Sequence, residues 1–246
     1  MAPAWRCVHH YTTRILRVAR LQRAVVQYWL MTITQEATPT KVASNGTGDE
    51  PTFRLKRLRR ERFIVPIRGT APLIVNRWSE KAKAQMLSAQ QTSARAKKSP
   101  KDPLAEFTAS RYRLNDDQDG FPATAFKAAI VHAARLFDKS LTQVIMKQTV
   151  IVAGIGAEQL VPIAGEITMR EDTPRNANGV ADLRYRAQYW PWSATLDVMC
   201  VEGQFDQYSV LALVDAAGVG GVGEWRPTSP KSATGTYGTF EIVEAS

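Results

Sequence analysis

The chain is poor in the residues that build disulfides and metal centres. Its 246 residues include only 2 cysteines and 3 histidines. Cys7 and Cys200 are far apart in the sequence, so they form neither a disulfide framework nor a cysteine-based zinc site. A reducing cytoplasm is therefore the expected compartment. No apolar run approaches the ~18 residues that span a bilayer, so we expect no membrane partner.

Patterns typical of catalysis are also missing. The chain has no Ser-His-Asp, Cys-His or HExxH arrangement, and His132 is expected to be an ordinary residue on a helix flank. Asp116, Asp117 and Asp119 cluster in a predicted turn without the closing glutamate of a calcium loop. We predict a protein that is not an enzyme and has no cofactor and no metal. A metal-dependent nuclease that uses Asp102 or the Asp116 cluster stays open as an alternative.

The first thirty residues contain no acid but five arginines. Their apolar residues are scattered around the helical wheel, which disfavours a transit peptide. We expect residues 1–30 to be a mis-called upstream extension, with Met31 as the start. The next segment, up to residue 52, is rich in Thr, Ser, Gly and Pro, so residues 1–52 are predicted to be a disordered leader.

Basic residues outnumber acidic ones, and the formal net charge is +9. Without the five arginines of residues 1–30 the charge falls to +9 − 5 = +4. Two further basic segments remain, at residues 53–63 and 91–103. An excess of this kind favours an anionic partner, with nucleic acid ahead of a membrane surface.

Apolar periodicity predicts strands and helices in mixed order after residue 62. Residues 63–67 are predicted to form a buried strand, and residues 79–90 a helix capped by Ser79. The clearest helix covers residues 121–137, with Phe126, Ala129, Ile130, Ala133 and Phe137 on its apolar face and Val131 on the opposite side. Further strands are expected at residues 149–155, 158–163, 166–172, 181–190, 193–203 and 237–244, and a second helix at residues 204–217.

Strands outnumber helices, and no regular strand–helix alternation occurs. This order predicts an α+β fold with a mainly antiparallel sheet and two main helices. We expect one domain from residue 53 to 246, with a basic loop inserted at about residues 91–120.

A segment at residues 216–227, "AAGVGGVGEWRP", has four glycines within six residues. A dinucleotide-binding loop needs a strand before the glycines and a helix after them, and here the predicted order is reversed. A P-loop would end in Gly-Lys-Ser/Thr. Both nucleotide motifs are therefore excluded. Gly218 is the expected helix C-cap, and the remaining glycines indicate a loop whose backbone approaches a phosphate backbone or another part of a protein.

The segment "ADLRYRAQYWPW" at residues 181–192 alternates basic and aromatic residues. As a strand, it places Arg184 and Arg186 on one face and Tyr185 and Tyr189 on the other. Arginine for phosphates and aromatic rings for bases are typical of proteins that bind single-stranded nucleic acid. An edge strand with one solvated face and one core face explains the same pattern equally well.

Three motifs together resemble the repeat-associated RNA-binding (RAMP) superfamily. They are "FIVPIRGTAPLIV", "GFPATAFKAAI" and the glycine-rich segment with its trailing "GTYGTFEI". The second motif departs from the family pattern at Ala123, Ala125 and Ala128. The resemblance is greatest to the backbone subunits of CRISPR effector complexes, and a stand-alone phage relative is a further option. It implies a modified ferredoxin- or RRM-like fold in a prokaryotic or phage-infected cell.

The resemblance also implies that Lys97 and Lys98 lie on an inserted, mobile element, and that the Lys127 helix and the glycine-rich segment flank a nucleic-acid groove. We predict a non-catalytic protein that binds single-stranded nucleic acid, with RNA favoured over DNA, and that forms a homo-oligomer or filament along it. A virion or assembly protein acting through protein contacts is the main alternative. The predicted nucleic-acid-binding residues are Arg95, Lys97, Lys98, Lys101, Lys127, Arg170, Arg184, Arg186, Gly220, Gly221, Gly223, Trp225 and Arg226.

Overall fold

The computed structural model describes residues 57–91, 101–174, 181–230 and 234–243. The predicted leader (1–52) lies outside these residues, so the proposed division into leader and domain stays a prediction. The elements are β1 (Arg60–Gly69), β2 (Leu73–Val75), α2 (Glu80–Gln91), α3 (Pro103–Ala109), β3 (Asp119–Pro122), α4 (Ala123–Ala133), the 3₁₀ turn η1 (Ala134–Leu136), α5 (Gln143–Thr149), β4 (Ile151–Ala153), β5 (Leu160–Asp172), β6 (Arg184–Val201), α6 (Gln207–Gly220) and β7 (Phe240–Ile242).

The sheet is built around the long strand β6. The strand order is β3-β5-β6-β1-β7, and β2 and β4 also pair with β6. One edge of β6 pairs with β5 and then β4, and the other edge pairs with β2 and then β1. All of these pairings are antiparallel, so the predicted mainly antiparallel sheet is confirmed.

The connectivity is that of a ferredoxin-like fold. In chain order, β1, α4, β5, β6, α6 and β7 form a βαββαβ series, and the central strands lie in the order β5-β6-β1-β7. This arrangement is the RRM-like α+β fold that the sequence predicts, with α4 and α6 as the two main helices. The remaining strands and helices are additions between β1 and β5.

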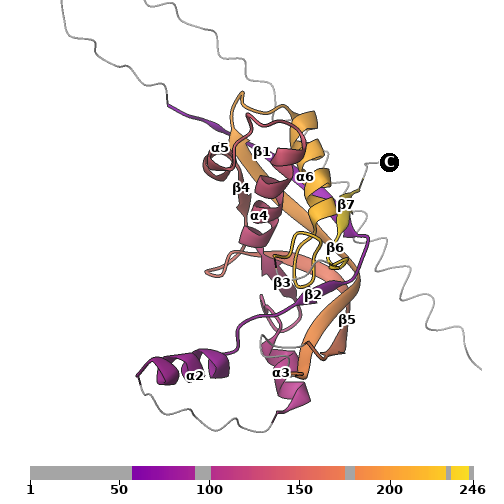
Figure 1. The fold of residues 1–246 in the computed structure, drawn as a ribbon. Helices are drawn as coiled ribbons and strands as arrows, with labels where there is room; N and C mark the ends of the chain where they lie inside the picture. The colour runs from indigo at the N-terminus through magenta and orange to yellow at the C-terminus, as the bar shows by residue number, and fades with distance from the viewer. Residues whose placement is uncertain (1–56, 92–100, 175–180, 231–233, 244–246) are drawn as a thin grey trace, which may run out of the picture. The chain divides into compact units, whose positions relative to one another are not determined.

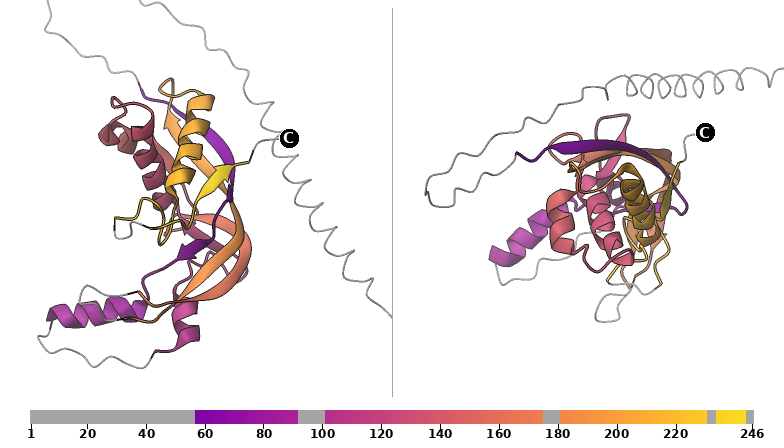
Figure 2. Two further views of the ribbon diagram at one scale, coloured as in Figure 1. Left: turned by 45° about the vertical axis from the view of Figure 1, so that its right-hand side comes forward. Right: turned by 90° about the horizontal axis from the view of Figure 1, so that it is seen from above.

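Helices α4 and α6 lie side by side over one face of the sheet (Figures 1 and 2). Phe126 and Ile130 of α4 are buried, as are Leu213 and Val214 of α6. They face alternate buried residues of the strands, such as Leu196. Each fully buried side chain of this size contributes about 1.5–3 kcal/mol. No described helix has the length and apolar character to cross a bilayer.

In the second half of β6, Ala194, Leu196, Val198 and Cys200 are buried and alternate with more exposed residues, as expected for a half-buried strand, whereas β1 differs from its prediction. Val65 and Ile67 are buried, but Ile64 is 43% exposed, because the helices cover only one face of the sheet. In α4, Val131 is buried and not solvated, since α5 and β4 also contact this helix. Phe137 is 52% exposed because the helix tightens into a 3₁₀ turn at Ala134, which rotates the following residue off the apolar face.

Several predicted elements are extended or replaced. The two strands expected between residues 158 and 172 are one strand, β5, with a register shift between Gly165 and Ile167. The two expected between residues 181 and 203 are the single strand β6. Helix α5, which Thr142 caps, is absent from the predictions. The described part of the predicted inserted loop contains α3 and the beginning of β3.

Helix α6 begins and ends later than its pattern predicts. Asp206 caps its N-terminus by accepting a hydrogen bond from Ser209 N at 2.7 Å. Gly218 is not the C-cap: it lies inside the helix, and Gly221, with φ +68°, ends it. A glycine is needed at Gly218 because α6 packs closely against β7 there.

Cys200 is a buried thiol in β6. Burial, followed by the nearby charge of Glu61, raises the pKa of Cys200 to about 11. The folded state therefore favours the protonated thiol. The preference of the folded state for the protonated thiol contributes to the free energy of unfolding. This contribution is complete below the ordinary thiol pKa of about 8.5 and is lost as the pH rises towards 11.

We expect Cys200 to resist thiol reagents until the protein unfolds. The measurement is labelling with Ellman's reagent in a Cys7→Ser variant, before and after addition of guanidinium. A Cys200→Val variant should lose less stability than the Cys7→Ser variant between about pH 8.5 and 11, the window set by the two thiol pKa values. Rapid stoichiometric labelling of the folded protein would contradict the prediction.

Candidate functional site

The glycine loop, defined here as residues 218–226, runs from the last turn of α6 towards β2. The backbone N–H of Glu224 donates to Ile74 O of β2 at 2.9 Å. The N–H of Val222 donates to Gly238 O at 2.9 Å, on the segment that leads into β7. The loop is therefore held between two other parts of its own chain.

The glycines allow this close approach. Gly223 has φ +81°, and a Cβ atom there would lie 2.6 Å from Ile74 O. Gly221 has φ +68°, with Tyr237 O 3.0 Å from its Cβ position, and a Cβ at Gly220 would lie 3.0 Å from Thr228 Cγ2. The spaces that the missing side chains leave are thus filled from within the chain. This gives Gly221 and Gly223 a structural role, whereas Gly220 meets only a side-chain methyl group; a role of the three glycines in binding nucleic acid stays a prediction.

A pocket of about 230 Å³ lies between α4 and the glycine loop. One wall is the face of α4 that carries Ala125, Ala128, Ala129 and His132, residues spaced three or four apart and therefore on one side of the helix. The opposite wall is the loop itself. The complete lining consists of Asn76, Tyr112, Phe121, Ala125, Ala128, Ala129, His132, Gly221, Val222, Gly223, Glu224, Arg226 and Thr228.

Polar groups from separate segments meet in this pocket. Asn76 Nδ2 donates to Glu224 Oε1 at 3.3 Å, and Arg226 Nη1 donates to Gly223 O at 2.8 Å. His132 Nδ1 lies 3.4 Å from Gln143 Nε2. Burial raises the pKa of Tyr112, with Glu158 and Glu224 adding to the effect and Arg77 opposing it. Its hydroxyl therefore stays protonated at neutral pH.

An ionic cluster joins the glycine loop to β5 and β6. It consists of Arg170, Asp172, Arg186 and Glu224. Arg170 Nε donates to Asp172 Oδ1 at 2.7 Å. Arg186 Nη1 is 3.7 Å from Asp172 Oδ2 and 4.0 Å from Glu224 Oε2. The Arg186 side chain is only 3% exposed, and its Nε and Nη1 atoms have no hydrogen-bond partner among the described residues. Burial lowers the pKa of Arg186. Arg186, which is predicted from the sequence to contact nucleic acid, therefore lies in the interior.

Two aromatic residues, Trp225 of the loop and Tyr237, contact Arg170 of this cluster. The Arg170 guanidinium lies 5.4 Å from the ring centroid of Trp225 and 4.7 Å from that of Tyr237. The two rings meet edge to face at 6.1 Å. Trp225 thus faces the ionic cluster, whereas Arg226 faces the pocket.

The remaining described cations of the predicted site lie in two places. Lys101 Nζ lies 2.8 Å from Asp182 Oδ1, and Arg184 Nε lies 3.0 Å from Asp182 Oδ2. Lys127 donates to Lys147 O at 2.8 Å, so its side chain reaches towards α5 and does not line the pocket. Lys127 therefore lies on another face of α4 than the residues that line the pocket, and its role in binding nucleic acid stays a prediction. Arg95, Lys97 and Lys98 lie outside the described residues.

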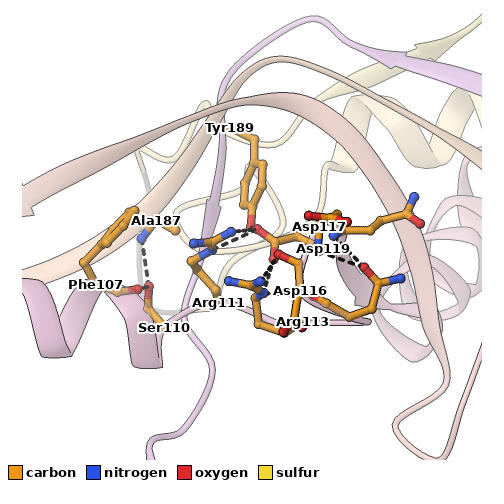
Figure 3. A network of polar contacts seen from close by, with 11 residues as sticks. Phe107, Ser110, Arg111, Arg113, Asp116, Asp117, Asp119, Ala187 and Tyr189 are labelled. Atoms are coloured by element: carbon orange, nitrogen blue, oxygen red, sulfur yellow. Dashed lines mark hydrogen bonds and ion pairs between the residues drawn. The ribbon is translucent and has the colours of Figure 1, made fainter.

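Two of the acidic residues considered for a nuclease, Asp119 and Asp102, have structural partners within the chain. Figure 3 shows Arg111, Arg113 and Tyr189 around the buried Asp119. Tyr189 Oη donates to Asp119 Oδ2 at 2.6 Å. Asp102 caps α3 by accepting from Ala105 N at 3.1 Å. Within the described residues, no three His, Cys, Asp or Glu side chains come together as metal ligands.

No protein-family model and no curated protein matches the chain. Among solved structures, the chain is similar to the one titled "Crystal structure of Cmr6 from Pyrococcus furiosus", at 10% sequence identity and a TM-score of 0.33. The alignment covers 76% of this chain and 100% of the other. A similarity at this level carries no inference about function, and the fold assignment rests on the strand order described above.

Proposed function

We propose that the chain is a non-catalytic protein that binds single-stranded nucleic acid, RNA in preference to DNA, and self-associates along it. The observation that carries the proposal is the pocket between α4 and the glycine loop. It is open to solvent, is lined by His132 and Tyr112, and has the guanidinium of Arg226 in its wall. Rings, hydrogen-bonding groups and an arginine are the groups that hold unpaired nucleotides.

A local excess of positive charge supports phosphate binding where β5 ends and β6 begins. Lys101 and Arg184 share the single carboxylate of Asp182. The group carries a net charge of +2 − 1 = +1, and the Arg184 side chain is 43% exposed. A phosphate that joins this group gains a charge-assisted hydrogen bond without burying an unpaired charge.

The motifs that resemble the RAMP superfamily lie next to one another in the fold. The second motif forms β3 and the start of α4, and the third forms the glycine loop and β7. Phe126 of α4 meets Phe240 of β7 edge to face at 6.0 Å. The resemblance therefore concerns one contiguous region, which includes the pocket.

Binding of a labelled single-stranded oligonucleotide should weaken as salt concentration rises. If three phosphates are contacted, affinity should fall about 20-fold between 50 and 200 mM salt, since counterions are released on binding. The measurement is fluorescence anisotropy with RNA and DNA of the same sequence. Affinity that does not change with salt, or no binding at low salt, contradicts the proposal.

A matched pair of arginine variants tests the location. Arg226→Gln should weaken binding and reduce the dependence on salt, because one phosphate contact is lost. Arg135→Gln removes the same charge from η1, outside the pocket lining, and should bind as the wild type does. Equal losses in both variants would indicate a general charge effect and no specific site.

Helix α2 favours a second candidate function, assembly through protein contacts. Trp78, Met86 and Leu87 are 56%, 46% and 56% exposed on or just before this helix. A helix of 12 residues gains little stability in water without a packing partner. Size-exclusion chromatography before and after nuclease treatment separates the two functions: an oligomer that survives complete removal of nucleic acid favours assembly by protein contacts.

A further inference from the structure

The pocket between α4 and the glycine loop has a carboxylate in its lining. Glu224 lines the pocket, and its side chain is 38% exposed. Asn76 donates to Glu224 Oε1, and the pocket also contains the protonated hydroxyl of Tyr112. A carboxylate is an unusual group for a protein that binds a polyanion, because it repels phosphate. Its position therefore calls for a ligand group that donates hydrogen bonds.

The buried Arg186 leaves the Glu224 carboxylate able to accept hydrogen bonds from a ligand. Arg186 Nη1 lies 4.0 Å from Glu224 Oε2, which offsets part of the negative charge but is beyond hydrogen-bond distance. The lone pairs of Oε2 are therefore not taken by Arg186. Asn76 holds the other oxygen and restricts the orientation of the carboxylate. Glu224 is thus positioned by two neighbours and still able to accept hydrogen bonds.

Guanine is the base that best fits such a group. Its Watson–Crick edge carries two adjacent donors, N1–H and N2–H, whose spacing matches the two oxygens of a carboxylate. Adenine and cytosine offer one amino group beside an acceptor, which a carboxylate repels. Uracil offers one imide N–H between two carbonyl groups. In a single strand these edges are unpaired and open to a protein.

The size of the pocket agrees with a base. Its volume of about 230 Å³ is below the ~300–1,000 Å³ that is typical of pockets for larger ligands. A base fits inside, and the sugar and phosphate stay outside. We propose that this pocket receives a guanine of the bound single strand, with Glu224 accepting hydrogen bonds from its N1–H and N2–H groups. The inference rests on the proposed binding of nucleic acid and adds selection of one base to it.

The first test of the guanine pocket changes one base of the oligonucleotide and leaves the protein unchanged. We compare a labelled uridine oligonucleotide with one that carries a single guanosine, and then replace that guanosine with inosine, which lacks the N2 amino group. The full chain should bind the guanosine oligonucleotide about tenfold more tightly than the inosine one. Replacement by 7-deazaguanosine, which changes only the opposite edge of the base, should have no effect.

Each failure has its own signature. If no oligonucleotide binds, the proposed function is wrong. If the uridine, guanosine and inosine oligonucleotides bind equally, nucleic-acid binding stands and the guanine pocket is overturned. If free guanosine monophosphate competes as strongly as the guanosine oligonucleotide itself binds, the pocket serves a free nucleotide, and the assignment to a strand is overturned.

Matched glutamate variants test the residue. Glu224→Gln should abolish the preference for guanosine over inosine, measured as the ratio of the two affinities within the variant. Glu158→Gln is the control, since Glu158 pairs with Arg77 near Tyr112 but does not line the pocket. It should keep the preference. A Glu224→Gln variant that still prefers guanosine overturns the proposal.

Discussion

Replacing Gly218 with alanine is expected to lower the free energy of unfolding by about 3 kcal/mol or more, the upper range for overpacking. Gly218 lies inside α6, where the helix crosses β7. A Cβ atom there would overlap the carbonyl oxygen of Phe240 and lie 2.8 Å from its carbonyl carbon. Because both groups are backbone, no side-chain rotation relieves the overlap. Guanidinium denaturation followed by circular dichroism measures the loss.

Gly220→Ala is the matched control in the same helix. Its Cβ would lie 3.0 Å from Thr228 Cγ2, a side-chain methyl that can move. Alanine also has a higher helix propensity than glycine by about 1 kcal/mol, which offsets the crowding. We expect the free energy of unfolding to change by less than about 1 kcal/mol. If Gly218→Ala were as mild as Gly220→Ala, α6 and β7 would not be packed as closely as described.

The contrast between these glycines shows what a local sequence pattern can and cannot predict about a helix end. Periodicity predicted the existence of α6 but placed its C-cap at Gly218. A glycine near the end of a helical pattern has two explanations, a left-handed cap or a close crossing, and both require the missing side chain. Only the position of β7, more than twenty residues later, separates them: Gly221 is the cap, and Gly218 is the crossing point.

The same limit applies to the candidate site. Alternation along β6 correctly placed Arg184 and Arg186 on one face. It could not show that Glu224, almost forty residues later, lies 4.0 Å from the buried Arg186, or that the ring of Trp225 lies against Arg170. The pocket likewise joins four segments that are separated in the sequence, which begin near Asn76, Tyr112, Ala125 and Gly221. Arg226 was predicted by its charge, whereas Glu224 and His132 carry no local signal.

The second large loss of stability is expected in the ionic cluster. Asp172→Ala should lower the free energy of unfolding by about 3–5 kcal/mol, the usual cost of removing one partner of a buried ion pair. The reason is the guanidinium that remains: Arg186 is 3% exposed, and its nearest acid in the cluster is Asp172 at 3.7 Å. Arg170 also loses a partner, but it is 25% exposed and can reach water.

A double-mutant cycle separates this cause from a simple loss of contacts. Arg186→Met removes the buried charge and keeps much of the apolar volume, so it should cost less than Asp172→Ala. The Asp172→Ala/Arg186→Met variant should be more stable than Asp172→Ala alone, since no guanidinium is left without a partner. Chemical denaturation of the four proteins gives the coupling energy. If the losses of unfolding free energy in the two single variants simply add, Arg186 is solvated or paired in another way. Arg186 then does not support Glu224 at the edge of the pocket either.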